Sequence, residues 1–339
     1  MKRNPLSLTT VADWHNLMAA FYLAARGKSG RPDVEDFRRI LFAQINQLQN
    51  DVLSGAYVPG PMRQFRIRDP KPRIIHAPCF RDRVLHHALM AHVGPVLDRA
   101  LVFDTYACRL QKGTLAAVLR AQRHIRRYPW YAKIDIRAYF ASIDHKILMA
   151  LLAQRFRDHG LLSLMARIIA AHQNASGTGL PIGALTSQIF ANYYLSSLDR
   201  LLLEQYRVSG MVRYMDDVVW WGQSREQVRT ALDAARTHTH SALHLGIKSP
   251  VQVGRSEQGV LFCGYRILPG ALRLSRRRKR RYIEGRRRWE TAFLHGAIDE
   301  KQLQAGYAAV LGMTLHADAV VWRQKQLQQQ PLATELEQV

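Results

Sequence analysis

Cysteine is scarce in this sequence, and its spacing excludes two kinds of stabilised fold. The chain has 339 residues but only three cysteines, Cys79, Cys108 and Cys263. They lie far apart and show no CxxC spacing, so neither a disulfide framework nor a zinc site is indicated. Because free thiols are usually buried, we expect these cysteines to be structural.

Long apolar runs are missing as well. No uninterrupted apolar stretch approaches the roughly 18 residues of a membrane span, and no basic segment leads into an apolar signal core. We therefore expect a soluble, cytoplasmic protein without a membrane partner. Hydrophobic residues still make up 47% of the chain, and this length predicts two or three packed units.

Acidic residues are few relative to basic ones. The chain has 49 Lys and Arg against 26 Asp and Glu, a formal net charge of +23. Such a surface attracts polyanions, so nucleic acid is the expected partner.

The hydrophobic patterns predict an α+β chain of three neighbouring subdomains. Helical spacing predicts two N-terminal helices within residues 10–50, and alternation predicts a bent strand pair at 65–75. Further predicted helices are 82–97, 144–156, 185–206, 225–244 and a basic helical tail from 275. Predicted strands are 131–136, 211–214, 218–221, 251–253 and 259–267.

Three acidic residues stand in β-prone runs that suit a sheet buried on one face. Asp216 and Asp217 separate two such runs, and Asp135 ends another. A bare pair of acids is common at a solvated turn, which is the alternative reading. If the Asp135 strand lies beside the hairpin, three carboxylates meet and can hold two magnesium ions for phosphoryl transfer.

The segment Tyr214-Met215-Asp216-Asp217 resembles the YxDD box of reverse transcriptases, in the same order with Asp135. The resemblance implies a right-hand polymerase fold with fingers, an antiparallel palm sheet and a helical basic thumb. The expected bounds are 1–129 for the N-terminal region and fingers, with a fingers return near 150–185, 130–270 for the palm and 271–339 for the thumb and tail. It also implies Mg²⁺, with Mn²⁺ as a substitute, held by Asp135, Asp216, Asp217 and the Ile136 carbonyl. Tyr214 and Met215 then lie at the primer end.

The same resemblance implies a nucleotide pocket. Phe140 matches the aromatic residue that blocks a ribose 2′-hydroxyl, although an ordinary core Phe fits the sequence too. Arg73, with Lys71 as second choice, grips the triphosphate of the dNTP, or else contacts the nucleic-acid backbone. The other expected pocket residues are Ala138 and Tyr139 through their N–H groups, Ile182, Gly183, Gln188 and Lys248.

The stretch 179–188 indicates a subtype. Ile182 stands where many reverse transcriptases have Gln, and the motif ends in Ser187-Gln188. This is similar to the enzymes of diversity-generating retroelements, which are bacterial or phage-encoded. Such enzymes copy a structured template-repeat RNA into cDNA with errors at adenines, beside an oligomeric accessory variability protein. Replacing an amide by an aliphatic side chain removes hydrogen bonds, so selectivity could fall.

A basic run opens the predicted thumb. Nine of the thirteen residues 276–288 are Lys or Arg, which favours contact with the phosphates of the RNA/cDNA duplex over a solvated face. The contacts expected at its start are Arg276, Arg277, Arg278, Lys279, Arg280 and Arg281.

Two other readings stay open. The chain could be another bacterial reverse transcriptase of intron, CRISPR-linked or phage-defence type, although intron proteins usually continue beyond the thumb. It could also be a non-catalytic RNA-binding scaffold, against which the three acids and Phe140 argue.

Overall fold

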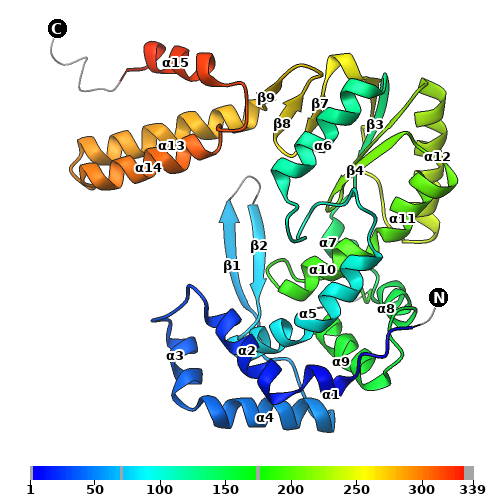
Figure 1. Ribbon diagram of the computed structural model, residues 1–339. Coiled ribbons are helices and arrows are strands. Elements are labelled where there is room, and N and C mark those ends of the chain that lie inside the picture. The colour runs from blue at the N-terminus through cyan, green and yellow to red at the C-terminus, as the bar shows by residue number, and fades with distance from the viewer. Residues whose placement is uncertain (1–2, 69–71, 173–175, 332–339) are drawn as a thin grey trace.

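The chain folds into a lower helical layer, a central sheet unit and a C-terminal group of helices (Figure 1). The computed structural model describes residues 3–68, 72–172 and 176–331. Within these residues, no helix is long and apolar enough to cross a membrane. The mixture of helices with antiparallel sheets confirms the predicted α+β class.

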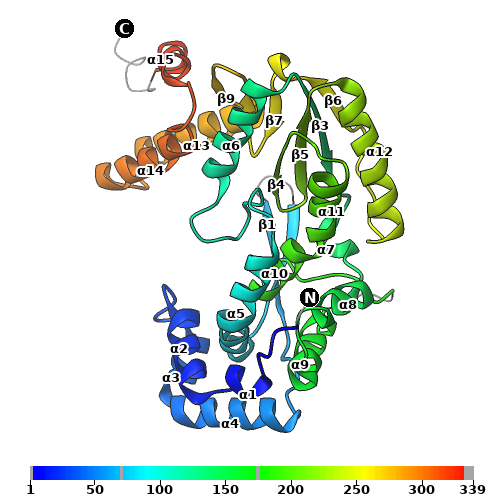
Figure 2. The same ribbon diagram turned by 45° about the vertical axis from the view of Figure 1, so that its right-hand side comes forward.

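The helical layer combines the N-terminal helices with a later segment that returns to them. It contains α1 (Leu8–Val11), α2 (Trp14–Ala25), α3 (Pro32–Arg39), α4 (Leu41–Ser54), α5 (Phe80–Ala100), α8 (His145–Ala153) and α9 (His159–Ala170). Asp158 caps α9 and also accepts a hydrogen bond from the Leu8 N–H at 3.3 Å, which joins the return segment to α1. A hairpin of β1 (Arg63–Arg68) and β2 (Pro72–Ala77) rises from this layer toward the sheet unit (Figures 1 and 2).

The central sheet has four antiparallel strands in the order β4-β5-β3-β6. These strands are β3 (Trp130–Asp135), β4 (Gly210–Tyr214), β5 (Asp217–Gly222) and β6 (Gln252–Arg255). Helix α12 (Arg225–Ser241) packs on one face, and α6 (Thr114–Arg127) packs on the other. Shorter elements complete the unit: α7 (Tyr139–Ser142), α10 (Leu185–Tyr194), α11 (Ser196–Arg200), the π-helical turn η1 (Leu201–Gln205) and the 3₁₀ turn η2 (Ser256–Gln258).

Both faces of this sheet are buried, which corrects the expectation of one buried face. In β5, Val218 and Trp220 belong to the main core, whereas Val219 and Trp221 belong to a second core with α6. Successive side chains of a strand point to opposite faces, so this continuous apolar run fills two cores.

A three-stranded sheet connects the central unit to the C-terminal helices. It contains β7 (Val260–Phe262), β8 (Tyr265–Ile267) and β9 (Leu272–Leu274). The C-terminal helices are α13 (Arg276–Leu294), α14 (Glu300–Gly312) and α15 (Val320–Gln329), of which α13 and α14 lie side by side (Figures 1 and 2).

Three predicted boundaries are wrong. The strand expected at 259–267 is the hairpin β7–β8, because Cys263 and Gly264 have φ of 48° and 82° and form a two-residue turn. The helix expected at 185–206 breaks after Tyr194, near the carbonyl of Asn192, which accepts a hydrogen bond from Arg213. The two helices expected within 10–50 are four, α1 to α4, since the backbone leaves helical geometry at Ala12–Asp13 and at Ile40.

The cysteines are also less buried than expected. Cys79 and Cys263 are partly buried, and Cys108 is exposed.

Candidate polymerase active site

The three acidic residues meet at one end of the central sheet. Asp135 and Asp217 are directly opposite each other in the β3–β5 pair. Tyr214 pairs with Asp217 across the β4–β5 hairpin, which leaves Met215 and Asp216 as its two-residue turn. The expected adjacency of the Asp135 strand and the hairpin is therefore confirmed.

The carboxyl groups of Asp216 and Asp217 are costly to ionise in this environment. Burial raises the pKa of Asp217 to about 7, nearby Asp135 and Asp216 add to the rise, and Lys133 opposes it. Burial likewise raises the pKa of Asp216, whereas the charges of Arg73 and Lys248 lower it. The charges of Lys133, Arg73 and Lys248 therefore lower these pKa values, but they do not fully offset the rise that burial causes.

Lys133 is a site residue to which the sequence analysis gave no role. Its Nζ lies 3.1 Å from Asp217 Oδ1 and donates to the Leu261 carbonyl at 2.6 Å. Lys133 and Asp135 are two residues apart in one strand and so share a face of the sheet. That spacing is the signal by which Lys133 could have been found.

The donor chemistry fits a hard divalent cation. Carboxylate oxygens are the ligands that Mg²⁺ prefers, and the buried Oδ1 of Asp217 has the Lys133 ammonium as its ion-pair partner but makes no hydrogen bond of normal geometry. Among the residues described, no three or more His, Cys, Asp or Glu side chains already form a metal-binding group. Binding of a shared ion would therefore require the carboxylates to turn toward it.

One cavity of about 1220 Å³ joins the acids to most of the residues expected to bind nucleotide and primer. Its lining includes Arg73, Asp135, Ile136, Ala138, Tyr139, Phe140, Ile182, Gln188, Tyr214, Met215, Asp216, Asp217, Lys248, Arg277, Arg278 and Arg281. These residues come from β2, β3, β4, β5, α7, α10 and α13 and from the loops between them. Lys71 lies outside the described residues.

Backbone hydrogen bonds join residues 135–137, which line this cavity, to residues 246–248. The Lys248 N–H donates to the Asp135 carbonyl at 2.8 Å, and the Arg137 N–H donates to the Gly246 carbonyl at 2.8 Å. Ile136 lies between these two bonds. Ala138, at φ 45°, starts the short helix α7, whose first-turn N–H groups lack acceptors within the helix.

The two aromatic residues of α7 differ in environment. The Tyr139 side chain is buried, its hydroxyl donates to the Ala191 carbonyl, and burial raises its pKa. Phe140 is partly buried against the main core while lining the cavity. Its carbonyl accepts from the Leu180 N–H at 2.7 Å, which ties α7 to the glycine-containing loop at 177–183.

That loop also packs on the β1–β2 hairpin. The His76 N–H donates to the Ile182 carbonyl at 2.9 Å. Gly183 has φ of 123°, and a Cβ there would lie 2.7 Å from Ile75 Cγ2. Gly183 is thus needed for close approach to β2, and it is absent from the cavity lining.

The basic residues that begin α13 separate into different environments. Arg276, Lys279 and Arg280 are outside the cavity lining, and Arg280 pairs with Glu284 at 3.5 Å. Arg278 lies over the Tyr265 ring at 4.1 Å and donates to the carbonyls of Cys263 and Met313. Arg278 therefore connects α13 to the β7–β8 turn as well as lining the cavity.

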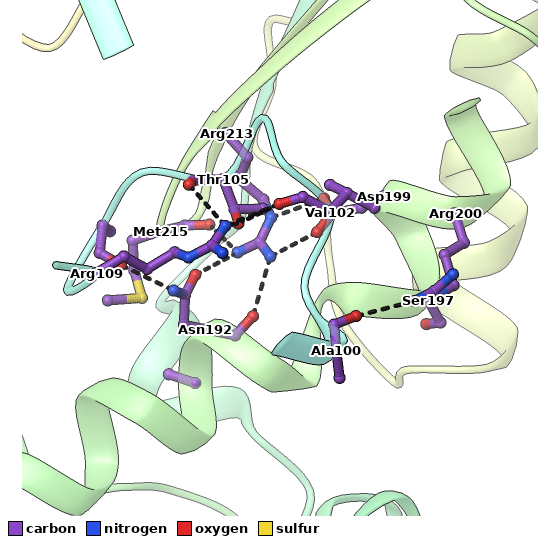
Figure 3. A network of polar contacts seen from close by, with 12 residues as sticks. Ala100, Val102, Thr105, Arg109, Asn192, Ser197, Asp199, Arg200, Arg213 and Met215 are labelled. Atoms are coloured by element: carbon purple, nitrogen blue, oxygen red, sulfur yellow. Dashed lines mark hydrogen bonds and ion pairs between the residues drawn. The ribbon is translucent and has the colours of Figure 1, made fainter. Parts of the chain in front are cut away.

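Arg213 is a second basic residue near the acids that the sequence did not indicate. Arg213, one residue before Tyr214, is fully buried and pairs with Asp199 of α11, also fully buried, at 2.6 Å (Figure 3). A buried Arg is rarely distinguishable by sequence from an exposed one in a basic chain.

The sequence comparisons agree with this geometry. Residues 67–248 match the family described as reverse transcriptase (RNA-dependent DNA polymerase), which is more than half of the chain. The chain therefore belongs to the reverse transcriptase family.

The relatives include proteins whose names refer to introns. Protein YkfC of Escherichia coli K12 is 25% identical over 243 residues, which are 66% of this chain and 63% of that protein. The group II intron-encoded protein LtrA of Lactococcus lactis is 25% identical over 172 residues, which are 48% of this chain and 28% of LtrA. The putative COX1/OXI3 intron 2 protein of Saccharomyces cerevisiae is 22% identical over 180 residues, which are 49% of this chain and 21% of that protein. The chain thus spans less than two thirds of the length of each.

Proposed function

We propose that this protein is an RNA-directed DNA polymerase whose catalytic residues are Asp135, Asp216 and Asp217. The observation that carries the proposal is the direct pairing of Asp135 with Asp217 beside the Asp216 turn, at the end of a buried sheet and inside one large cavity. The family assignment supports the same reaction class. Divalent cation, with Mg²⁺ first and Mn²⁺ as a substitute, is the proposed cofactor.

The reaction joins a primer 3′ oxygen to the α-phosphorus of a dNTP, and the bond from that phosphorus to the pyrophosphate breaks. When two Mg²⁺ ions are bound, they ease loss of the 3′-hydroxyl proton and offset the charge of the departing pyrophosphate. Asp135, Asp216 and Asp217, with the Ile136 carbonyl, would hold the ions. The raised pKa values of Asp216 and Asp217 support this assignment, because an added positive charge would offset the cost of ionising these buried groups.

Other cavity residues orient the substrates. Arg73 provides a planar guanidinium for the triphosphate, and Lys248 provides a second charge near the leaving group. The first-turn N–H groups at Ala138 and Tyr139 suit phosphate oxygens, and the Phe140 ring, which lines the same cavity, would exclude a 2′-hydroxyl. Tyr214 and Met215 would contact the primer end.

The three parts of the fold correspond in this proposal to fingers, palm and thumb. The β1–β2 hairpin and the helical layer would act as fingers, the central sheet as palm, and α13 to α15 as thumb. Arg276, Arg277, Lys279, Arg280 and Arg281 would contact duplex phosphates, a sequence-independent interaction that weakens with salt.

The finer proposal is a diversity-generating retroelement enzyme that copies a template-repeat RNA into adenine-mutagenised cDNA in the cytoplasm. It rests on Ile182 and Gln188, both of which line the cavity with the acids. An accessory variability protein and a structured RNA would be its partners. The competing function is an intron-type reverse transcriptase, favoured by similarity to intron-encoded proteins.

Primer extension on an RNA template with Mg²⁺ tests the general proposal. Asp216→Asn removes one carboxylate charge and should abolish dNTP incorporation, whereas Asp233→Asn alters an exposed acid of α12 and should not. Incorporation by Asp216→Asn at the wild-type rate would exclude this site. Absence of incorporation by the wild-type protein would favour the RNA-binding scaffold.

A matched template pair tests the subtype. A template-repeat RNA and an intron RNA would be copied in parallel, and the cDNA sequenced. Errors concentrated opposite adenines support the retroelement function, and uniformly accurate copying supports the intron type.

A further inference from the structure

The Arg213 guanidinium uses all of its hydrogen-bonding capacity inside the protein. An Arg side chain has five N–H donors. Nε and one Nη2 hydrogen donate to the two carboxylate oxygens of Asp199, at 2.7 and 2.6 Å. The other Nη2 hydrogen donates to the Asn192 carbonyl at 3.0 Å, and Nη1 donates to Asn192 Oδ1 at 2.9 Å.

The fifth donor reaches the catalytic turn itself. Arg213 Nη1 also donates to the carbonyl of Met215 at 3.0 Å (Figure 3). That carbonyl belongs to the peptide group that joins Met215 to Asp216. A buried ion pair is thus attached to the backbone immediately before a catalytic carboxylate.

This backbone needs an external constraint. Met215 has φ of 58°, in the left-handed region that is strained for residues with a Cβ. Strained conformations persist when surrounding structure over-determines them, and they concentrate at active sites. The bond from Arg213 to the Met215 carbonyl supplies such a constraint.

The backbone of Arg213 is itself held by the neighbouring segment 104–106. Its N–H donates to the Asp104 carbonyl at 2.9 Å, and its carbonyl accepts from the Tyr106 N–H at 2.9 Å. Arg109 fixes this neighbouring segment through the carbonyl and hydroxyl of Thr105, at 3.1 and 2.6 Å. Asn192 Nδ2 adds a bond to the Ala107 carbonyl at 2.8 Å.

We propose that Arg213, oriented by Asp199 and Asn192, is a positioning residue that holds Met215 in its left-handed conformation and so aims Asp216 and Asp217 into the cavity. This inference rests on the polymerase function proposed above. It predicts that the shape of the arginine matters and not only its charge. A Lys has three donors on one nitrogen and cannot reproduce the planar five-bond arrangement.

Arg213→Lys is therefore the first test, with Arg120→Lys as the matched control. Arg120 forms a similar two-bond pair with Asp104, at 2.8 and 3.0 Å, and both bonds go to that carboxylate and not to the turn. We expect Arg213→Lys to lower kcat for dNTP incorporation by at least about tenfold while KM for dNTP stays within about threefold, because loss confined to the transition state lowers kcat. Arg120→Lys should retain kcat within about twofold, because Arg120 is partly exposed and its charge is kept.

A double variant separates positioning from general structural damage. Glycine adopts positive φ freely, so Met215→Gly removes the strain that Arg213 offsets. Met215→Gly alone should lower activity, since Met215 lines the cavity. In the double variant Arg213→Lys/Met215→Gly, the fold-loss of activity should be clearly smaller than the product of the fold-losses in the two single variants. Independent, multiplicative losses would overturn the inference.

Hydrogen exchange gives a readout that does not depend on catalysis. Amides of residues 212–218 should exchange faster in Arg213→Lys than in wild type, with no change at 130–135 and none in Arg120→Lys. Unchanged exchange at 212–218 would overturn the inference even if the wild-type protein showed no polymerase activity. Should Arg213→Lys be insoluble, Asn192→Ala is measured instead, since it removes one anchor and keeps the Arg213–Asp199 pair.

Discussion

Removing the Arg213 charge while leaving Asp199 should destabilise the protein strongly. In Arg213→Met, a carboxylate that is 0% exposed loses its cation. Breaking a buried pair from one side costs about 3–5 kcal/mol. Five hydrogen bonds at a net value of about 1 kcal/mol each give about 5 kcal/mol, so the two routes agree. A loss of this size is a large part of the stability of a typical domain.

Urea unfolding followed by tryptophan fluorescence measures this loss, because Trp220 and Trp221 lie in the two cores. Arg236→Met is the control. Its pair with Asp233 is exposed, at 51% and 72%, so the expected loss is under about 1 kcal/mol. Arg213→Met with Asp199→Leu should be more stable than Arg213→Met alone, since no unpaired charge remains.

The same variant should show a characteristic pH dependence. Burial raises the pKa of Asp199, and Arg213 opposes that rise. Without Arg213 the folded-state pKa rises further above the unfolded value of about 3.9. The folded state then binds more protons than the unfolded state, so the deficit relative to wild type should shrink as the pH falls from 7 toward that unfolded value. A deficit under about 1 kcal/mol at pH 7, or one that grows in acid, would refute this account of the pair.

Three further substitutions test the cavity. Phe140→Ala should raise the kcat/KM for ribonucleotides relative to dNTPs by at least about tenfold in single-nucleotide incorporation, because the proposed steric block is removed; an unchanged ratio would assign Phe140 to packing. Ile182→Gln should reduce errors opposite template adenines in sequenced cDNA, with Ile182→Leu as the control, and an unchanged error spectrum would remove Ile182 from selectivity. Gly183→Ala should lower the free energy of unfolding by about 1–3 kcal/mol, since φ is 123° and Cβ would meet Ile75 at 2.7 Å; wild-type stability would show that the loop can shift.

The grouping of the acids was predictable because it depends on local pattern. Asp135 ends one apolar strand, Asp216 and Asp217 separate two others, and antiparallel pairing of these strands brings the acids together. The same reasoning could have found Lys133, two residues before Asp135. Strand alternation is a short-range property, so a single sequence contains it.

The Arg213 network was not predictable in this way. Its partners Asn192 and Asp199 lie in a segment that reads as one continuous helix, whereas the structure breaks that helix beside them. The pattern of apolar residues likewise does not indicate the positive φ at Cys263 and Met215. Such features depend on contacts between distant segments, which override local preference.

The basic residues of the chain therefore have two separate roles: some attract nucleic acid at the surface, and others hold the strands next to the Met215-Asp216 turn. The net charge of +23 attracts nucleic acid through residues on the surface, and salt should weaken that attraction. Lys133 and Arg213 contact the acid-bearing strands from opposite faces of the sheet, one at the Asp217 carboxylate and one at the Met215 carbonyl. Because these two contacts are enclosed, they should be screened little by salt. High salt should thus weaken template binding well before it changes the geometry of the acids.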